Sequence, residues 1–326
     1  MSKRILITFS ILLAACSKSP AGNTAGEFKV ALITPGSVND AAWNAGAYQG
    51  LRQIRDSVGA VVSNIEAHTP AEQEEALRSY ARQGFTIVFG HGYEFQDPAE
   101  RVAQDFPKTI FVITSGERLR GNVVPIEFRI HEATYLAGML AGALTRTGKI
   151  GFIGGMELPP IKLGYDGWVA GAKAVRPNVE SRVTYLNTFD DAAAGKEAAL
   201  AMIRLGVDQL HHNADAAALG IFSAAKESAN TFVYGANGDQ VSLAPDRVVA
   251  SAIVDLPRAF LLVARDVKQG TFVPHTESFG LQSGVIRLAT NPDLESRWPV
   301  GLKAKIQAAS DSIAAGTLKP AGHAAQ

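Results

Sequence analysis

The sequence predicts an α/β protein built from two doubly wound parallel-sheet domains that are joined by a hinge. Short β-branched runs alternate with helical segments between residues 28 and 254, a pattern typical of parallel sheets covered by helices on both faces. The same alternation restarts near residue 149, which indicates a second unit. A chain of 326 residues is long enough for two domains of roughly 150 residues, each with its own core.

The first unit is expected to begin with a strand at 28–33 and a helix at 42–58. In the segment 70–83, Ala71, Ala76, Leu77 and Tyr80 recur near helical spacing, which predicts a further helix. The other elements expected in this unit are strands at 60–65, 86–89 and 109–113 and a helix at 98–105.

The second unit follows a helix that His131 and Glu132 open. Its expected strands are 149–153, 182–186, 209–212, 231–234 and 248–254, and its expected helices are 165–175, 192–205 and 216–228. We therefore assign residues 27–130 to one lobe and 131–240 to the other, each completed by part of 240–316. The tail 317–326 is expected to be loose.

Residues 1–15 have the pattern of a signal peptide that ends at the only cysteine of the chain, Cys16. Lys3 and Arg4 precede an apolar stretch of about ten residues, far below the roughly 20 needed to span a bilayer. The sequence Leu-Ala-Ala-Cys resembles the bacterial lipobox, in which the cysteine is lipidated. We therefore expect residues 16–26 to be a lipid-anchored tether, which holds the protein on the extracytoplasmic face of the membrane.

Composition and motifs argue against several classes of protein. The formal net charge is +0, with 31 basic and 31 acidic side chains, whereas nucleic-acid binders carry a basic excess. No Gly-x-Ser-x-Gly elbow or His-Glu-x-x-His helix is present, so the sequence predicts no catalytic residues. His211 and His212 are adjacent on a predicted strand and point to opposite faces, so no metal site is expected there.

Ligands of doubly wound sheets bind beyond the carboxyl ends of the strands, and the loop after the first strand contains Asp40, Trp43 and Asn44. Two interpretations remain open for this loop. Asp40 can cap the following helix while Trp43 joins the core. Alternatively, the indole supplies a stacking face for a flat ligand whose edge the two polar side chains bind.

Three later loops also hold candidates. Gly92 and Tyr93 follow the strand 86–89, where glycines let the backbone approach a ligand closely, although a tight turn with a solvated His91 explains them equally well. Tyr165 and Trp168 begin a helix near the cleft, and one is expected to face the ligand while the other packs. Asn237 and Asp239 follow the strand 231–234 and form either a plain turn or a set of hydrogen-bond partners for hydroxyl groups.

A set of short motifs extends over nearly all of the chain beyond residue 28. The motifs are Asp40-Ala41-Ala42-Trp43-Asn44, Glu132-Ala133-Thr134-Tyr135-Leu136-Ala137-Gly138, Thr147-Gly148-Lys149-Ile150-Gly151-Phe152-Ile153-Gly154-Gly155, Gly167-Trp168-x-x-Gly171-Ala172, Phe189-x-Asp191 with Gly195-Lys196-Glu197, Ala224-Ala225-Lys226-Glu227 and Asn237-Gly238-Asp239-Gln240. With them the chain resembles the basic membrane protein family of bacterial lipoproteins, which are substrate-binding components of ABC importers.

The resemblance implies a type I periplasmic-binding-protein fold and a purine nucleoside held between two aromatic rings, here Trp43 and Tyr165. Asp40 and Asn44 are then expected to bind the base or the ribose. Asn237 stands where the family has an aspartate, and Val254 lies near the place of a frequent lysine. These departures leave a nucleobase or a vitamin-like heterocycle as an alternative ligand.

The expected partners are a small-molecule ligand, the ABC permease subunits and, through the anchor, the membrane. The resemblance implies a monomer that needs no cofactor and binds no nucleic acid. A ligand sensor or regulator of the same fold is the alternative function that the sequence leaves open.

Overall fold

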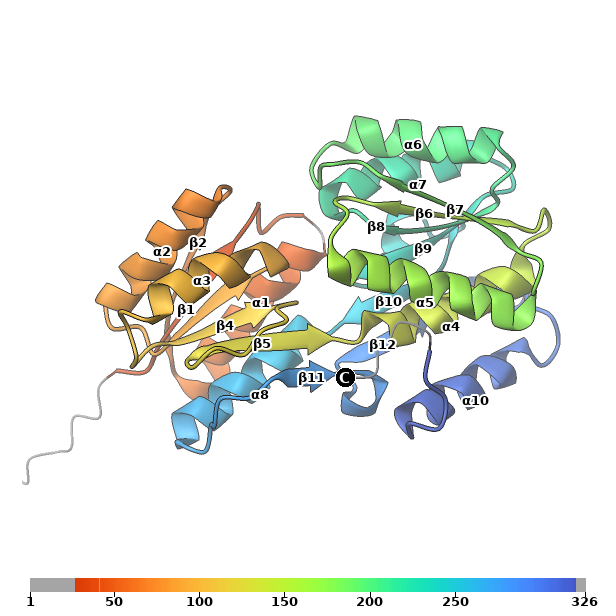
Figure 1. The fold of residues 1–326 in the computed structure, drawn as a ribbon. Helices are drawn as coiled ribbons and strands as arrows, with labels where there is room; N and C mark the ends of the chain where they lie inside the picture. The colour runs from red at the N-terminus through yellow and green to blue at the C-terminus, as the bar shows by residue number, and fades with distance from the viewer. Residues whose placement is uncertain (1–26, 41, 321–326) are drawn as a thin grey trace, which may run out of the picture.

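The computed structural model describes residues 27–40 and 42–320, which form two lobes beside each other (Figure 1). Each lobe contains a six-stranded sheet with helices on both faces. We call the lobe around the sheet that contains β1 the first lobe, and the lobe around the sheet that contains β6 the second lobe. The fold class predicted from the sequence is therefore confirmed.

The first lobe has strand order β11-β5-β4-β3-β1-β2, and all its neighbouring strands are parallel. Its elements are β1 (Lys29–Thr34), α1 (Trp43–Val58), β2 (Val61–Glu66), α2 (Pro70–Arg82), β3 (Ile87–His91), η1 (Tyr93–Phe95), α3 (Gln96–Ala103), β4 (Ile110–Thr114), β5 (Val123–Phe128), α8 (Leu256–Gln269) and β11 (Glu277–Phe279). The strand β1 shows why an uninterrupted apolar run suits this position. Val30 and Leu32 pack toward α1 and α8, whereas Ala31 and Ile33 pack toward α2 and α3.

The second lobe has strand order β12-β10-β9-β8-β6-β7. Its elements are α4 (Ile130–Leu144), β6 (Lys149–Gly154), α5 (Pro159–Val175), β7 (Glu180–Tyr185), α6 (Ala192–Arg204), β8 (Gln209–Asn213), η2 (Asp215–Ala217), α7 (Ala218–Glu227), β9 (Phe232–Asn237), η3 (Val241–Leu243), β10 (Val248–Val254), η4 (Leu281–Ser283) at the junction with the first lobe, β12 (Ile286–Thr290), α9 (Pro292–Glu295) and α10 (Leu302–Ala314). Phe152 packs toward α4 and α5, and its neighbour Ile153 packs toward α6 and α7.

The structure corrects the sequence-based elements in a few places. The helix expected from residue 165 begins at Pro159, because Pro159 and Pro160 occupy its first turn, where a missing N–H does no harm. Strand β12 runs antiparallel to β10, so the second sheet is not purely parallel. The elements β5, α8, β11, β12, α9 and α10 were not expected from the sequence.

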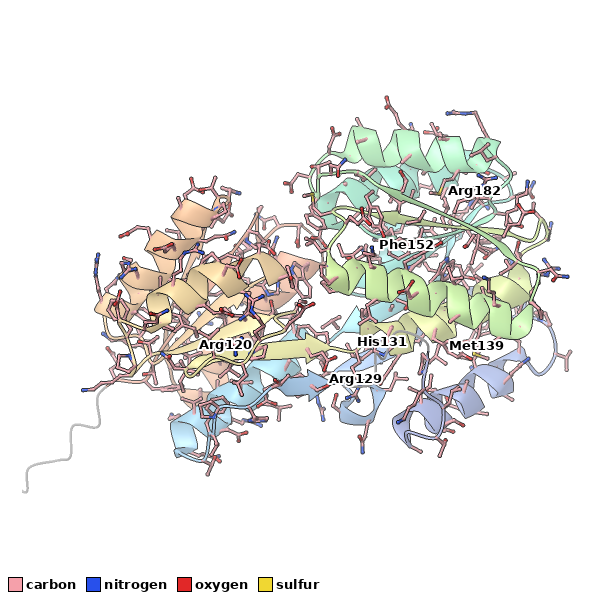
Figure 2. The ribbon with its side chains drawn as sticks, viewed as in Figure 1. Arg120, Arg129, His131, Met139, Phe152 and Arg182 are labelled. Carbon is pink, nitrogen blue, oxygen red and sulfur yellow. The ribbon has the colours of Figure 1, made fainter. Side chains whose placement is uncertain are left out.

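The chain passes between the lobes at three places, namely between β5 and α4, between β10 and α8, and between β11 and β12. Figure 2 shows Arg129 at the first of these crossings. Its guanidinium pairs with Glu132 at 2.7 Å and also donates to Ser278 at 3.0 Å. The other carboxylate oxygen of Glu132 accepts the backbone N–H of Leu281 at 2.6 Å. These bonds tie the first crossing to the third.

Helices α4 and α5 pack backbone against backbone in the second lobe. A Cβ at Gly171 would overlap the carbonyl oxygen of Tyr135 and lie 3.0 Å from the backbone nitrogen of Met139. Gly138 meets the backbone of Trp168 in the same way. The two helices can approach this closely only because these positions have no side chain. Within the described residues, no helix combines the length and the apolar character needed to cross a membrane.

Candidate ligand-binding site

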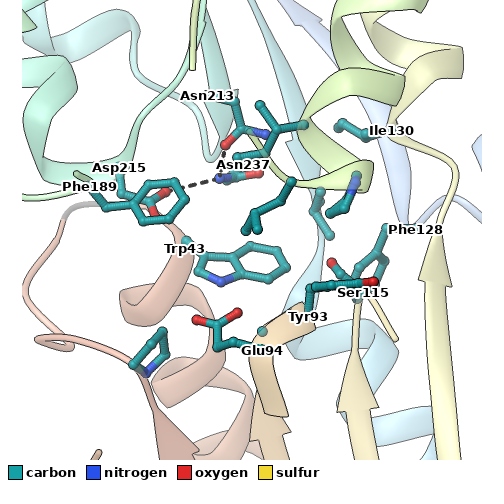
Figure 3. A pocket seen from close by; sticks show the side chains of 16 residues that line it. Trp43, Tyr93, Glu94, Ser115, Phe128, Ile130, Phe189, Asn213, Asp215 and Asn237 are labelled. Atoms are coloured by element: carbon teal, nitrogen blue, oxygen red, sulfur yellow. Dashed lines mark hydrogen bonds between the residues drawn. The ribbon is translucent and has the colours of Figure 1, made fainter. Parts of the chain in front are cut away.

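A pocket lies between the two lobes, at the ends of the strands where the loops meet (Figure 3). Almost all its lining residues end a strand, follow its carboxyl end or begin the next helix. The lining comprises Pro35, Trp43, Gly92, Tyr93, Glu94, Ser115, Phe128, Ile130, Leu158, Pro160, Ile161, Phe189, Asn213, Asp215, Asn237 and Val254. Both lobes therefore contribute to one pocket, at the carboxyl ends of the strands, where doubly wound folds bind their ligands.

Trp43 forms the aromatic wall of the first lobe. It is the first residue of α1, and its ring stacks on His91 with centroids 4.2 Å apart. The ring of Phe128 lies nearly perpendicular to the indole, with the two centroids 6.0 Å apart. Since His91 covers one face of the indole and Trp43 lines the pocket, the other face is available to a ligand.

Asp40 positions Trp43 rather than lining the pocket. Its carboxylate accepts the backbone N–H groups of Ala42, Asn44 and Ala45 at 3.1, 2.7 and 3.0 Å. These groups are the free donors at the start of α1, so Asp40 acts as the helix cap that one interpretation of the sequence expected. Asn44 is buried beside it and also lies outside the lining.

Phe189 forms the aromatic wall of the second lobe. It lies in the loop between β7 and α6 and packs next to Gly155, where a Cβ would overlap its ring. Gly155 follows β6, so this glycine of the sequence motif makes room for the Phe189 side chain. Phe189 and Trp43 approach the pocket from opposite lobes in Figure 3.

Three polar residues of the lining have a strained backbone. The described non-glycine residues with positive φ are Ser115, Asn187, Asp215 and Asn237, and all but Asn187 line the pocket. Such conformations are costly outside glycine and occur often at binding sites. Here they turn polar side chains at three strand ends toward the same space.

Asp215 and Asn237 are hydrogen-bonded to each other. The Asn237 Nδ2 donates to Asp215 Oδ1 at 3.3 Å and to Asn213 Oδ1 at 3.4 Å. Burial raises the pKa of Asp215 well above its ordinary value, and the nearby carboxylates of Asp40, Glu94 and Asp190 raise it further. The group is therefore harder to ionise than a solvated aspartate.

Glu94 adds a second carboxyl group to the lining. It belongs to η1, directly after β3, and burial raises its pKa. Gly92 has φ of 144°, and a Cβ there would overlap the Glu94 carboxylate. The glycine thus lets the carboxylate lie against the backbone.

The structure places Tyr165, Trp168 and Asp239 outside this pocket, which corrects their expected positions. Trp168 is 0% exposed and packs against Tyr234 at 4.9 Å, so it belongs to the core of the second lobe. The Tyr165 hydroxyl lies 3.1 Å from Ser181 Oγ, away from the pocket lining. Asp239 is exposed and lines a separate groove beside α1 and α8.

Of the residues expected at the site, Trp43, Gly92, Tyr93 and Asn237 do line the pocket. Sequence reasoning missed Glu94, Ser115, Phe128, Phe189, Asn213 and Asp215. Most of these follow the end of a strand, and that signal was available for Phe189 and Asp215. Residue Cys16 lies outside the described residues.

The two histidines at the end of β8 are structural. His211 Nδ1 lies 3.0 Å from the carbonyl oxygen of Tyr234, and His212 Nε2 lies 3.0 Å from Gln240 Oε1. Burial lowers the pKa of His211 to about 4 and that of His212 to about 3. Among the described residues, no three His, Cys, Asp or Glu side chains are grouped so that they could hold a metal ion.

Comparisons with known proteins agree with this architecture. Residues 28–308 match the family described as ABC transporter substrate-binding protein PnrA-like. The chain is 30% identical to basic membrane protein A of Borreliella burgdorferi, covering 91% of this chain and 89% of that protein. It is also 30% identical to the ABC transporter nucleoside-binding protein BmpA of Lactococcus lactis, covering 88% and 92%.

A solute-binding protein of an ABC transporter system from Aeropyrum pernix has the same fold. It superposes with a TM-score of 0.83 at 23% identity, covering 90% of this chain and 93% of the other. Because the family match spans most of the chain, the resemblance inferred from the motifs is confirmed. The chain belongs to the basic membrane protein (PnrA-like) family of ABC transporter substrate-binding proteins, whose members bind solutes and are not catalysts.

Proposed function

We propose that this protein captures a flat heterocyclic nutrient, a purine nucleoside or a related compound, and delivers it to its ABC permease. The observation that carries the proposal is the interlobe pocket with Trp43 on one lobe and Phe189 on the other. Two aromatic side chains with polar groups between them suit a planar ligand, since stacking needs only a π-face. Phe189 takes the place that the sequence assigned to Tyr165.

The nucleoside-binding relative from Lactococcus lactis supports a nucleoside as the first ligand to test. The neutral amide oxygen of Asn237 is a weaker acceptor for ribose hydroxyl groups than an ionised aspartate at the same position would be. The Nδ2 group of Asn237 is already directed at Asn213 and Asp215. A nucleobase or a vitamin-like heterocycle therefore remains part of the proposal.

A thermal-shift screen tests the proposal with nucleosides, free bases and heterocyclic vitamins. A ligand that binds only the folded state raises the midpoint, by about 2.7 kcal/mol of stability at 100 times its Kd. We expect at least one planar heterocycle to raise it and simple sugars and amino acids to leave it unchanged. Stabilisation by a sugar alone would contradict the aromatic site. Loss of uptake of the ligand in cells lacking the protein distinguishes transport from sensing.

The location of the protein is proposed from Cys16 and its flanking residues. We expect Cys16→Ala to move the protein from the membrane fraction to the soluble fraction or to stop its processing. Stable anchoring needs more than one acyl chain, and the thiol is the attachment point. Cell fractionation with immunoblotting measures the effect, and Ser17→Ala serves as the control. A Cys16→Ala protein that is processed and stays with the membrane would show that another element holds it.

A further inference from the structure

The pocket has an unbalanced set of charges. Its 16 lining residues include the carboxyl groups of Glu94 and Asp215 but no Lys, Arg or His. Neither carboxyl group takes part in an ion pair with a described residue. Asp40 and Asp190 lie close enough to disfavour the ionised form of Asp215. A ligand entering this space meets two carboxyl groups and no cationic side chain of the lining.

The lining also contains hydrogen-bond acceptors that are available to a ligand. The Asn237 amide donates to Asn213 and Asp215, so its donor group is directed at the protein. The carboxyl oxygens of Glu94 and Asp215 and the amide oxygen of Asn237 are acceptors. Together with the hydroxyl groups of Tyr93 and Ser115 and the amide of Asn213, these acceptors can receive hydrogen bonds from donor groups of a ligand.

The aromatic walls supply no positive charge either. His91 stacks under Trp43 and is fully buried between the indole and Thr114. Burial lowers the pKa of His91 to about 3, so the ring is neutral at physiological pH. The π-faces of Trp43 and Phe189 then attract a cation, because an aromatic face carries partial negative charge.

We infer that this pocket selects a heterocycle that carries a positive charge, with Glu94 and Asp215 as its counter-charges and Trp43 and Phe189 stacked on its ring. The inference rests on the proposed function and narrows the ligand within it. The two carboxyl groups come from opposite lobes, Glu94 from the loop after β3 and Asp215 from η2 after β8. A cationic ring between the lobes offers these carboxyl groups a counter-charge that the lining itself lacks, whereas a neutral ring offers none.

Without a counter-charge, the buried carboxyl group of Asp215 destabilises the folded protein when it is ionised. The pKa of Asp215 is raised in the folded protein, mainly by burial and then by Asp40, Glu94 and Asp190. A raised carboxyl pKa means that the ionised form destabilises the fold at neutral pH, and that this penalty disappears as the pH falls through the folded pKa. Asp215→Asn is therefore expected to raise the melting temperature of the unliganded protein at neutral pH, while weakening its binding of a cation. A merely structural role for Asp215 predicts a loss of stability instead.

Matched pairs of probes test the charge preference directly. Adenosine with 1-methyladenosine, and nicotinamide with 1-methylnicotinamide, each pair a neutral ring with its N-methylated cation. Titration calorimetry uses the full-length protein in detergent, together with Glu94→Gln and Asp215→Asn. Asp166→Asn is the matched control, because it removes the same charge from an exposed position of α5.

In the parent protein we expect the cation of at least one pair to bind about tenfold or more tighter than its neutral partner. Glu94→Gln and Asp215→Asn should each remove most of this preference, and Asp166→Asn should keep it. Equal binding of both members, or tighter binding of the neutral ones, overturns the inference while leaving the proposed function in place. If no heterocycle in either pair or in the wider screen binds, the proposed function itself fails and the inference fails with it.

Discussion

Gly171→Ala is expected to destabilise the protein by about 3 kcal/mol or more, as a severe overpacking substitution does. The new methyl group would overlap the carbonyl oxygen of Tyr135 and lie 3.0 Å from the backbone nitrogen of Met139. Backbone atoms cannot move aside as a flexible side chain can. Helices α4 and α5 would have to separate, and the core around Trp168 would open with them.

Gly164→Ala is the matched control in the same helix, and its expected effect has the opposite sign. A Cβ at Gly164 lies 3.8 Å from a methyl carbon of Ile130 and 3.9 Å from one of Thr134, which is ordinary van der Waals contact. Alanine is favoured over glycine inside a helix by about 0.5–1 kcal/mol. The variant should therefore be as stable as the parent or slightly more stable.

Urea unfolding of the three proteins, followed by circular dichroism, measures both effects. The midpoint should fall clearly for Gly171→Ala and stay constant or rise for Gly164→Ala, with similar slopes for all three. Equal stability of the two variants would mean that α4 and α5 do not pack as closely as the structure shows. Because Gly171 belongs to a motif of the sequence, this result also decides whether the motif serves packing.

The α/β class and most strands could be predicted from the sequence because the physical signal is local. Strands such as β1 and β6 are buried on both faces, so they appear as continuous apolar runs. Strand β11 has only three residues, and in β12 the exposed Arg287 follows the buried Ile286. Such edge strands depend on their partners in space, and no periodicity within a few residues identifies them.

The site was predictable to the extent that it follows the strand ends. Trp43 stands out because a large aromatic residue in a polar loop after a strand needs an explanation. Neither Trp168 nor Tyr165 lines the pocket, although a ligand contact was expected for one of them. A helix near the cleft has one face toward the cleft and one away from it, and the sequence does not show which residues lie on which face. Phe189 depends on the absent side chain of Gly155, a contact between segments far apart in the chain. The directions in which the Asp215 and Asn237 side chains point depend on positive φ values of the backbone, which the composition alone does not indicate.

Trp43→Ala is expected to weaken binding of the heterocyclic ligand by the roughly 1–3 kcal/mol that one stacked base contributes, or about fivefold to 150-fold in Kd. The indole stacks on His91 and packs against the perpendicular ring of Phe128, so its orientation is fixed before the ligand arrives. That preorganisation means little entropy is lost when the ligand stacks. The alanine variant therefore loses both the stacking face and its fixed orientation.

Trp43→Phe tests whether an aromatic ring of any kind is sufficient at this position or whether the indole itself is needed. Phenylalanine keeps an aromatic ring at the start of α1, so its Kd should stay within a few-fold of the parent value, while Ala loses most of the affinity. Ligand binding should also change the indole fluorescence of the parent and not that of the phenylalanine variant, because Trp168 is buried in the core of the second lobe and Trp298 lies outside the pocket lining. Unfolding of each variant is measured alongside, since Trp43 also packs on His91. A folded Trp43→Ala protein that binds every ligand as tightly as the parent would place the ligand away from the indole.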